Sequence, residues 1–422
     1  MSSSQRRASR RRIFYGWYIV AAGMVSHLWI SIAWIYGKQV FFTPIVQTFG
    51  WSRAVVSGAF SLERLESSIT TPLEGFAVDR FGPRKLILVG GLLAGLGLVS
   101  LGFLQDVWMF YASVLVISVG TSASMGVPRT WAIVQWFRRL RGRALGIGGS
   151  GAVISGPLLI IVVWLIEAVG WRRAFVVLGI VTWAISIPVA LVYRSRPQQY
   201  GYLPDGDPPA QATTAAPQRP AGAVAGERVF TVSDALRTPT FWVVTLAFGV
   251  LGMGISALGV HQVPYLESIG FTTTQAVSSL GVYTLLSVFG RLGGGWAMDF
   301  LDKRLVLAGL LACEALAFLV LANITTYWQV VPFAFLYGTA FGGSIPARGV
   351  VISSYFGTRS FGGIQGLSQS AAVLGGTLGP VIMGWDFDVN GSYTRSVYFL
   401  MAVAALAVPF SLLARPPRPG AR

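Results

Sequence analysis

The feature that most limits how this chain can fold is its series of long apolar segments. They recur at the length needed to cross about 30 Å of hydrocarbon. Charged residues make up only 11% of the 422 residues and hydrophobic residues 54%, whereas a soluble domain carries roughly 25% charged residues. Twelve membrane spans are predicted, at residues 14–42, 52–77, 84–104, 107–136, 142–168, 172–193, 240–264, 273–297, 304–323, 326–356, 361–385 and 394–414. The chain is therefore predicted to be an α-helical protein embedded in a lipid bilayer.

The positions of the basic residues explain the net charge of +16. With the N-terminus inside, 23 of the 32 Lys and Arg residues fall in cytoplasmic segments or at cytoplasmic span ends, four fall at outer span ends, and five lie further inside spans. Such an excess is the positive-inside pattern of membrane proteins. It predicts that both termini are cytoplasmic, and it makes nucleic-acid binding an unnecessary explanation of the charge. The arginines of residues 6–12 precede a full-length span and are interpreted as a cytoplasmic anchor instead of a signal peptide.

An internal repeat divides the chain into two halves. Residues 194–239 are rich in Pro, Ala, Thr and Gly and are predicted to be a flexible cytoplasmic linker. We expect a basic N-terminus at 1–13, a six-helix bundle at 14–193, a second six-helix bundle at 240–414 and a cytoplasmic C-terminus at 415–422. Matching strings recur at an offset of 219–220 residues: Gly75 to Asp79 with Gly295 to Asp299, Trp136-Phe137 with Tyr355-Phe356, and Gly142 and Gly146 with Gly362 and Gly366. The predicted fold class is an all-α membrane protein of twelve transmembrane helices in two pseudo-symmetric six-helix bundles, with a substrate site near the midplane between them.

The segment after the second span carries a family resemblance. The string Gly75-x3-Asp79-Arg80-x-Gly82-x-Arg84-Lys85 resembles the loop signature of the major facilitator superfamily, and it lies between the second and third predicted helices, as in that family. The resemblance implies the major facilitator fold. Asp79, Arg80 and Arg84 would then form a cytoplasmic gate with neighbouring helix ends, and the repeat adds Asp299 and Arg304 to it.

Further strings resemble the bacterial branch of the monocarboxylate porter family. They are Tyr15-Gly16-Trp17-Tyr18, Gly50-Trp51-Ser52-Arg53-Ala54, Trp136-Phe137-Arg138-Arg139, Arg141-Gly142-Arg143-Ala144-Leu145-Gly146, Gly170-Trp171-Arg172 and Gly201-Tyr202-Leu203-Pro204-Asp205-Gly206. The resemblance implies a secondary active transporter of small monocarboxylates in the bacterial inner membrane, working by alternating access with proton symport. Carboxylate exchange, as in the related oxalate–formate exchangers, is the alternative. We expect it to act as a monomer.

Other functions are less well supported by the sequence. The chain has one cysteine, Cys313, and two histidines, His27 and His261, and it lacks HExxH, Gly-x-Ser-x-Gly and ATP-binding motifs. We therefore expect neither an enzyme nor a bound cofactor or metal. A carrier of another organic solute is an alternative, although the excess of basic over acidic residues in the predicted cavity favours an anion. A receptor that has lost transport is also left open.

Five basic residues lie within predicted spans, at Lys38, Arg64, Arg129, Arg291 and Arg348. Each would cost about 2.5–3.5 kcal/mol at the bilayer centre, so we expect them to face water, a counter-ion or the bundle interior. Polar and aromatic side chains precede several of them at helical spacing, which indicates an aqueous path for an anion. Arg129 and Arg348 are 219 residues apart, so the repeat places them on related helices.

The predicted substrate site centres on Arg291. The family resemblance puts the carboxylate-binding arginine at this position, and a guanidinium can bind a carboxylate through two parallel hydrogen bonds without losing its proton. Other predicted substrate contacts are Lys38, Arg129, His261, Tyr265, Ser287, Tyr337 and Arg348. For Arg129 and Arg348, gating or salt bridging between the halves is an equal alternative. For Arg64, charge balance with Glu63 and Glu66 is the preferred role.

Three residues are predicted candidates for proton coupling: His261, Glu63 and Glu66. The chain departs from its relatives at two relevant places. Animal members have an aspartate where Ser287 stands, which weakens proton coupling through an Asp–Arg pair. The oxalate–formate exchangers have a lysine in helix eleven, where this chain has Gln365, Ser368 and Gln369. Without that lysine, the chain cannot hold a doubly charged substrate between an arginine and a lysine, so such a substrate is disfavoured.

Overall fold

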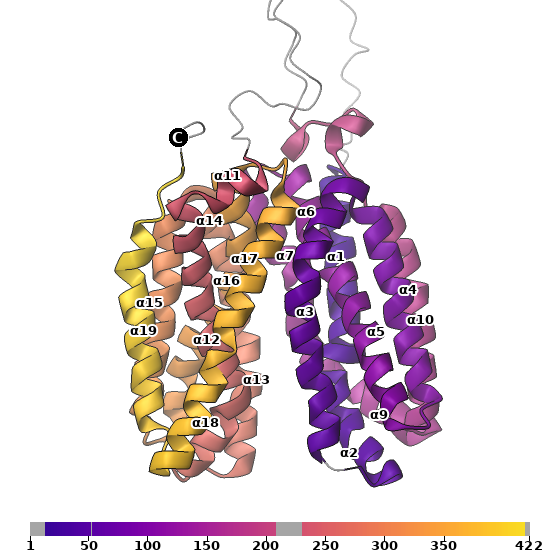
Figure 1. Cartoon of the computed structure of the whole chain (residues 1–422), viewed down its shortest axis with the longest axis vertical. Coiled ribbons are helices and arrows are strands. Elements are labelled where there is room, and N and C mark those ends of the chain that lie inside the picture. The colour runs from indigo at the N-terminus through magenta and orange to yellow at the C-terminus, as the bar shows by residue number, and fades with distance from the viewer. Residues whose placement is uncertain (1–12, 52, 208–229, 418–422) are drawn as a thin grey trace, which may run out of the picture.

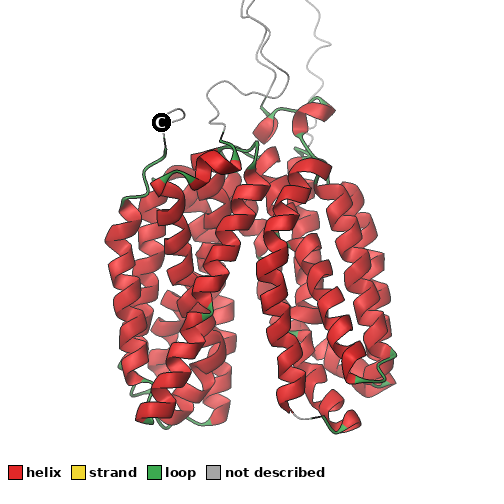
Figure 2. Ribbon diagram, in the orientation of Figure 1, coloured by secondary structure: helices red, strands yellow, loops and turns green. Residues whose placement is uncertain are grey.

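The computed structural model describes residues 13–51, 53–207 and 230–417, and no strand occurs within these ranges. Figure 1 shows two groups of roughly parallel helices, one from each half of the chain, and Figure 2 shows that loops are confined mainly to the two ends. We call the end that carries residues 194–239 and the C-terminus the linker end. The other is called the opposite end.

The first half contains ten α-helices and one π-helical turn. They are α1 (Gly16–Ile30), η1 (Ser31–Ile35), α2 (Gly37–Phe49), α3 (Arg53–Phe81), α4 (Pro83–Gly102), α5 (Val107–Met125), α6 (Val127–Trp136), α7 (Arg141–Gly149), α8 (Gly151–Leu158), α9 (Ile160–Val169) and α10 (Trp171–Val192). Helix α4 packs against α5 and α10. The α4–α5 approach needs glycine, because a Cβ on Gly90 would lie 2.7 Å from the carbonyl oxygen of Gly120. Small residues permit this close packing inside membranes.

The second half repeats this plan. It contains α12 (Pro239–Ser268), α13 (Thr273–Phe289), the π-helical turn η4 (Gly290–Gly294), α14 (Gly295–Phe300), α15 (Lys303–Ala322), the short η5 (Tyr327–Gln329), α16 (Val330–Phe356), α17 (Phe361–Gly376), α18 (Leu378–Asn390) and α19 (Thr394–Leu412). Glycine again allows close packing, because a Cβ on Gly342 of α16 would lie 2.1 Å from the carbonyl oxygen of Ser287 of α13.

Within the described ranges, nine helices are long and apolar enough to cross a membrane, or ten if the bent pair Arg141–Ser155 and Ile160–Val169 is one span. The two remaining predicted spans are also helical. Helix α3 has 29 residues but carries several charged side chains, and α17 and α18, of 16 and 13 residues, are separated at Thr377. The predicted all-α membrane architecture in two bundles is confirmed, and helices occupy all twelve predicted spans.

The described residues of the connecting segment contain three short helical elements. They are η2 (Pro197–Tyr200), η3 (Pro204–Gly206) and α11 (Val232–Leu236). The Asp205 carboxylate accepts hydrogen bonds from the backbone N–H groups of Arg138, Arg139 and Leu140, which anchors the segment beside the start of α7. The prediction of a flexible linker over all of residues 194–239 therefore needs this refinement. Residues 208–229 lie outside the described ranges.

The two halves are joined at the linker end. Helix α3 packs along α17, and α7 packs against α14, η4 and α16. Further toward the centre, the Ser370 hydroxyl donates to the carbonyl of Ser68 at 2.6 Å. In Figure 1 the helices of the two halves meet near the linker end and diverge toward the opposite end. The structure is thus in a conformation with the linker end closed.

Candidate functional site

Two arginines from opposite halves converge on one short stretch of backbone. Arg129, on α6 and 8% exposed, donates from Nη1 to the carbonyl of Gly148 at 2.8 Å. Arg291, in η4 and 2% exposed, donates from Nη1 to the carbonyl of Gly149. The two guanidinium groups therefore lie beside consecutive peptide units where the halves meet.

The local sequence explains why these carbonyls are available. Helix α7 ends at Gly149 and α8 begins at Gly151, so the last carbonyls of α7 lack the helical partners that continuous helix would supply. A glycine at position 146 lets η4 approach, because a Cβ there would lie 2.2 Å from the carbonyl oxygen of Arg291. The π-helical form of η4 also fits a functional role, since π-helical turns occur frequently at functional sites.

Three ring side chains surround the pair of arginines. The Nδ1 atom of His27 lies 3.2 Å from Nη1 of Arg129. Tyr36 lies near Arg291. The Tyr193 hydroxyl lies beside Arg129, because both side chains pack against Gly23. Neutral hydrogen-bonding groups of this kind can orient a polar ligand without cancelling the positive charge.

The arginines lack acidic partners in the described part of the chain. The ion pairs there join Lys38 to Glu63, Arg139 to Asp205 and Asp207, Arg143 to Asp299, and Arg304 to Asp302. The Nε atoms of Arg129 and Arg291 also have no hydrogen-bond partner. The guanidinium of Arg291 lies 5.5 Å from the centroid of the Phe341 ring, a favourable cation–π distance that does not neutralise it. The site therefore holds two buried positive charges and free donors that match an anion.

Lys38 lies in a separate, neutralised cluster. Its Nζ is 2.6 Å from Oε2 of Glu63, and Nε1 of Trp34 donates to Oε1 of the same carboxylate at 3.2 Å. Glu66 accepts a hydrogen bond from the hydroxyl of Ser118, while its Oε1 has no partner. The side chain of Arg64 lies outside the described part of the structure. Two of the three predicted proton-coupling residues therefore lie on α3, with Glu63 already paired.

The other predicted substrate residues have partners elsewhere in the second half. Nε2 of His261 is 3.0 Å from the carbonyl oxygen of Pro380, and the Tyr265 hydroxyl donates to the carbonyl of Leu321 at 2.8 Å. The Ser287 hydroxyl donates to the carbonyl of Thr284 within its own helix. The remaining two make aromatic contacts: Arg348 lies 4.8 Å from the Phe248 ring, and Tyr337 packs edge-on against Tyr283.

The predicted gate contains two carboxylates that reach across the interface. Asp79 accepts hydrogen bonds from the backbone N–H groups of Gly362 and Gly363 at 3.2 and 2.9 Å, and from Nε1 of Trp131 at 2.8 Å. Both glycines are at the start of α17, where a negative charge also interacts favourably with the helix dipole. The carboxylate thus ties α3 of the first half to α17 of the second.

Asp299 makes the symmetry-related contact. It accepts from the backbone N–H groups of Gly142 and Arg143 at 2.6 and 3.1 Å, at the start of α7. Glycine allows the helices to approach closely at both places. A Cβ on Gly142 would lie 1.8 Å from the carbonyl oxygen of Gly295, and a Cβ on Gly75 would lie 2.1 Å from the carbonyl oxygen of Gly362. We call each of these contacts, an aspartate of one half bound to the first N–H groups of a helix in the other half, a latch. The internal repeat of the sequence therefore produces two related latches.

The basic residues predicted for the gate have different surroundings. Arg80 and Arg84 are exposed, and Arg80 lies 5.4 Å from the ring of its neighbour Phe81. Arg304 donates from Nε to the Asp302 carboxylate at 3.1 Å, and this hydrogen bond holds the pKa of Asp302 below its usual value. Of the five residues predicted for the gate, Asp79 and Asp299 make the described hydrogen bonds between the halves in this conformation.

Sequence reasoning missed several buried residues. Glu74 on α3 is 7% exposed and Glu314 on α15 is fully buried, and the carboxylate oxygens of both lack hydrogen-bond partners. Both acids lie inside predicted spans, so the criterion that marks the five basic residues also marks them. Tyr36 and Tyr193 carried no sequence signal, because only the folded structure brings them to the arginines.

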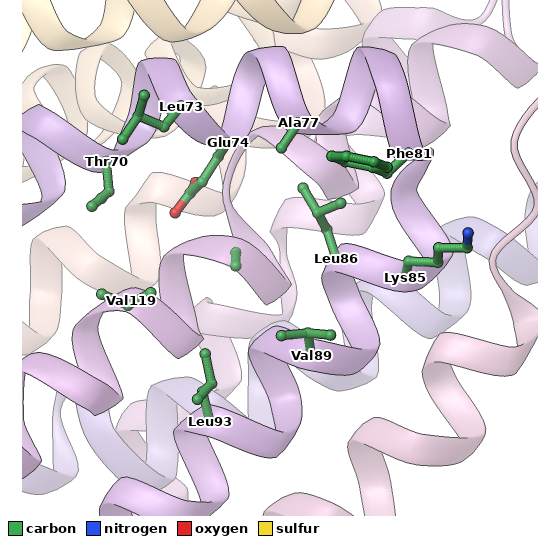
Figure 3. A pocket seen from close by; sticks show the side chains of 11 residues that line it. Thr70, Leu73, Glu74, Ala77, Phe81, Lys85, Leu86, Val89, Leu93 and Val119 are labelled. Carbon is green, nitrogen blue, oxygen red and sulfur yellow. The ribbon is translucent and has the colours of Figure 1, made fainter.

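Glu74 faces a pocket of ≈ 480 Å³ between α3, α4 and α5. Figure 3 shows its carboxylate directed into the pocket, with Leu86 and Val89 of α4 on the far wall and Lys85 at one end. Leu73 and Val89 at its edge are 61% and 54% exposed. The pocket therefore opens where these two side chains of α3 and α4 are exposed.

Comparison with known proteins agrees with this architecture. The chain matches the family described as Major Facilitator Superfamily over residues 18–325 and 279–422. It is 26% identical to the oxalate:formate antiporter of Oxalobacter formigenes, covering 89% of this chain and 87% of that protein. It is 27% identical to monocarboxylate transporter 13 of Bos taurus, covering 93% and 87%. The structure of the E. coli fucose:proton symporter superimposes with a TM-score of 0.71 at 14% identity, covering 96% of this chain and all of that one.

The match to the family covers nearly the whole chain, and the fold, the internal repeat and the two interfacial latches accord with it. The chain is thus a multi-pass membrane transporter that belongs to the major facilitator superfamily.

Proposed function

We propose that the protein carries small monocarboxylates of the lactate, pyruvate and acetate type, with proton symport and alternating access. The observation that carries this proposal is the pair of buried arginines, Arg129 and Arg291, which lack acidic partners among the described residues. Burying a charge without a counter-ion is unfavourable. A substrate carboxylate would supply that counter-ion and satisfy the free Nε donors.

The location of the arginines fits alternating access. They come from different halves and both contact the break between α7 and α8. A carboxylate bound there would touch both halves at once and would favour conformations in which the arginines stay close. Release from either side would follow when one half turns relative to the other, with residues 14–193 and 240–414 moving as two bodies.

We also propose that the linker end faces the cytoplasm of a bacterial cell, with both termini inside. The support is the distribution of Lys and Arg along the sequence. In that orientation, the latches at Asp79 and Asp299 hold the cytoplasmic side closed, and the substrate site would open to the outside.

Exchange of carboxylates without net proton movement is the second candidate function. Its support is the presence of two uncompensated guanidinium groups, which suit a dicarboxylate better than a single arginine would. One relative is named as an oxalate:formate antiporter. The two candidates differ in whether a pH gradient alone drives accumulation.

Uptake into proteoliposomes tests both candidates. Labelled lactate, pyruvate, acetate, formate and oxalate would be offered with and without an inward-directed proton gradient, and with and without unlabelled carboxylate inside. Symport predicts accumulation driven by the gradient alone, while exchange predicts uptake only with internal carboxylate. The exposed Arg173→Ala variant is the control for loss of a positive charge. Failure of all five substrates under both conditions would contradict the proposed substrate class.

A further inference from the structure

Glu314 is the most deeply buried acid of the described chain. It lies near the middle of α15, its exposed fraction is 0%, and neither carboxylate oxygen has a hydrogen-bond partner. Helix α15 packs against α12, α14, α16 and α19. An isolated ionised carboxylate is so unfavourable in such surroundings that the group takes up a proton instead. In this conformation Glu314 is therefore a neutral acid.

The space around Glu314 is shaped for the carboxyl group. A Cβ on Gly254 of α12 would lie 2.4 Å from Oε1 of Glu314, so glycine at this position leaves the room that the carboxyl group occupies. The titratable neighbour on α16 is Tyr337, whose hydroxyl donates at 3.3 Å to the carbonyl of Ile255, the residue that follows Gly254. Four charged or titratable groups of the packed helices have described partners elsewhere: Arg348 of α16 lies against Phe248, Arg395 at the start of α19 bonds Asn390, His261 of α12 contacts Pro380, and Asp299 of α14 caps α7.

A line of phenols leads from Glu314 to the two arginines. The rings of Tyr337 and Tyr283 meet edge-on with centroids 5.0 Å apart. Tyr283, on α13, lies near Tyr36 of the first half, and Tyr36 lies near Arg291. The line crosses between the halves at Tyr36 and Tyr283. Any rotation of one half against the other must therefore change it.

We propose that Glu314 is the group that binds the transported proton, and that Tyr337, Tyr283 and Tyr36 link it to Arg291. This inference rests on the proposed symport. One proton adds to the Glu314 carboxylate to give the neutral acid while one carboxylate binds at the arginines, and the O–H bond breaks again after rotation. No electron is transferred, and the loaded carrier moves one negative and one positive charge together.

The decisive variant is Glu314→Gln, which keeps the shape of the side chain but cannot lose a proton. With an inward gradient of one pH unit, the wild type should hold the carboxylate at about a tenfold higher concentration inside than outside, because each carboxylate enters with one proton. Glu314→Gln should lose this accumulation and become insensitive to pH, yet exchange labelled for unlabelled carboxylate at the wild-type rate. Glu167→Gln, which neutralises an exposed acid on α9, is the matched control and should behave like the wild type.

Wild-type accumulation in Glu314→Gln would overturn the inference, as would exchange by the wild type with no accumulation driven by pH. Tyr337→Phe provides a second variant, since it removes only a hydroxyl group. It should slow the accumulation driven by the pH gradient, and an unchanged accumulation rate would remove the phenols from the pathway.

Infrared spectroscopy separates this inference from the substrate assignment. The wild-type protein without substrate should show the carbonyl band of a protonated carboxylic acid, and this band should be lost in Glu314→Gln and kept in Glu167→Gln. If no carboxylate is transported but the band is present, the proposed substrate class fails and the protonated Glu314 stands. If the band is unchanged in Glu314→Gln, the inference fails whatever the substrate is.

Discussion

Replacing Asp79 with asparagine should weaken the closed state of the linker end. The carboxylate accepts two backbone hydrogen bonds from α17, across the interface between the halves, and a third from Trp131. An asparagine side chain presents one oxygen and one NH₂ group, so at least one N–H of Gly362 or Gly363 loses its acceptor and the other bond becomes neutral.

The size of the effect follows from these contacts. Hydrogen bonds to charged groups contribute about 1.5–3 kcal/mol and neutral ones about 0.5–1.5 kcal/mol. A charge at the end of a helix adds about 0.3–1 kcal/mol. Because relaxation and water recover part of the loss, we expect the closed state to be destabilised by about 1–2 kcal/mol. This corresponds to a roughly 5–30-fold change in the ratio of closed to open molecules.

Distances between spin labels measure this ratio. Labels on cysteines at the exposed positions Lys85 and Leu301, in a Cys313→Ser background, report the separation of the halves at the linker end. Asp79→Asn and Asp299→Asn should both increase the long-distance fraction and lower the turnover rate while leaving substrate affinity nearly unchanged. Asp302→Asn is the matched control, because Asp302 pairs with Arg304 beside it and not across the interface. Unchanged distances and rates in both latch variants would refute the gating role.

Three further predictions concern packing, topology and charge pairing. Gly142→Ala should exclude the closed state and stop turnover, because its Cβ would overlap the carbonyl of Gly295. Gly309→Ala adds a methyl group in open space and should transport at the wild-type rate in the same assay. Single cysteines introduced at Gln5, Ala215 and Gly420 should stay unlabelled by an impermeant reagent added to intact cells, and efficient labelling of any of them would overturn the proposed orientation. Lys38→Met and Glu63→Gln should each lower the yield of folded protein in detergent, because each leaves one charge without its partner, and the double variant should recover the yield. A double variant whose loss of yield equals the two single losses added together would contradict the pairing.

The fold could be predicted from the sequence because its causes are local and repeated. Apolar runs of spanning length require helices, and the offset of about 220 residues between Gly75 to Asp79 and Gly295 to Asp299 requires two related halves. The interruptions inside spans were harder to predict. The breaks at Ser150 and Thr377 and the π-helical turns η1 and η4 lie inside predicted spans, where the apolar pattern alone does not mark them.

The site was predictable only in part. A charge inside a span marks Arg129 and Arg291 as unusual, but it does not show that both would meet at Gly148 and Gly149. A charge inside a span also marks Lys38 and Arg348. In the structure, Lys38 pairs with a carboxylate and Arg348 lies against an aromatic ring. Partners of this kind come from distant parts of the chain, such as Glu63 and Phe248, so residue spacing could not distinguish a substrate-binding cation from a paired one.

The account depends most on Arg291 as an anion-binding residue, and equilibrium binding to the purified protein tests it directly. A labelled carboxylate transported by the wild type would be titrated against the wild type, Arg291→Ala, Arg291→Lys and the exposed control Arg173→Ala. Loss of charged hydrogen bonds worth about 1.5–3 kcal/mol predicts affinity lowered by more than about tenfold in Arg291→Ala. Lysine should recover little of it, because a single ammonium cannot form two parallel hydrogen bonds. Wild-type affinity in a folded Arg291→Ala protein would contradict the central claim and would leave Arg129 or Arg348 as the next candidate.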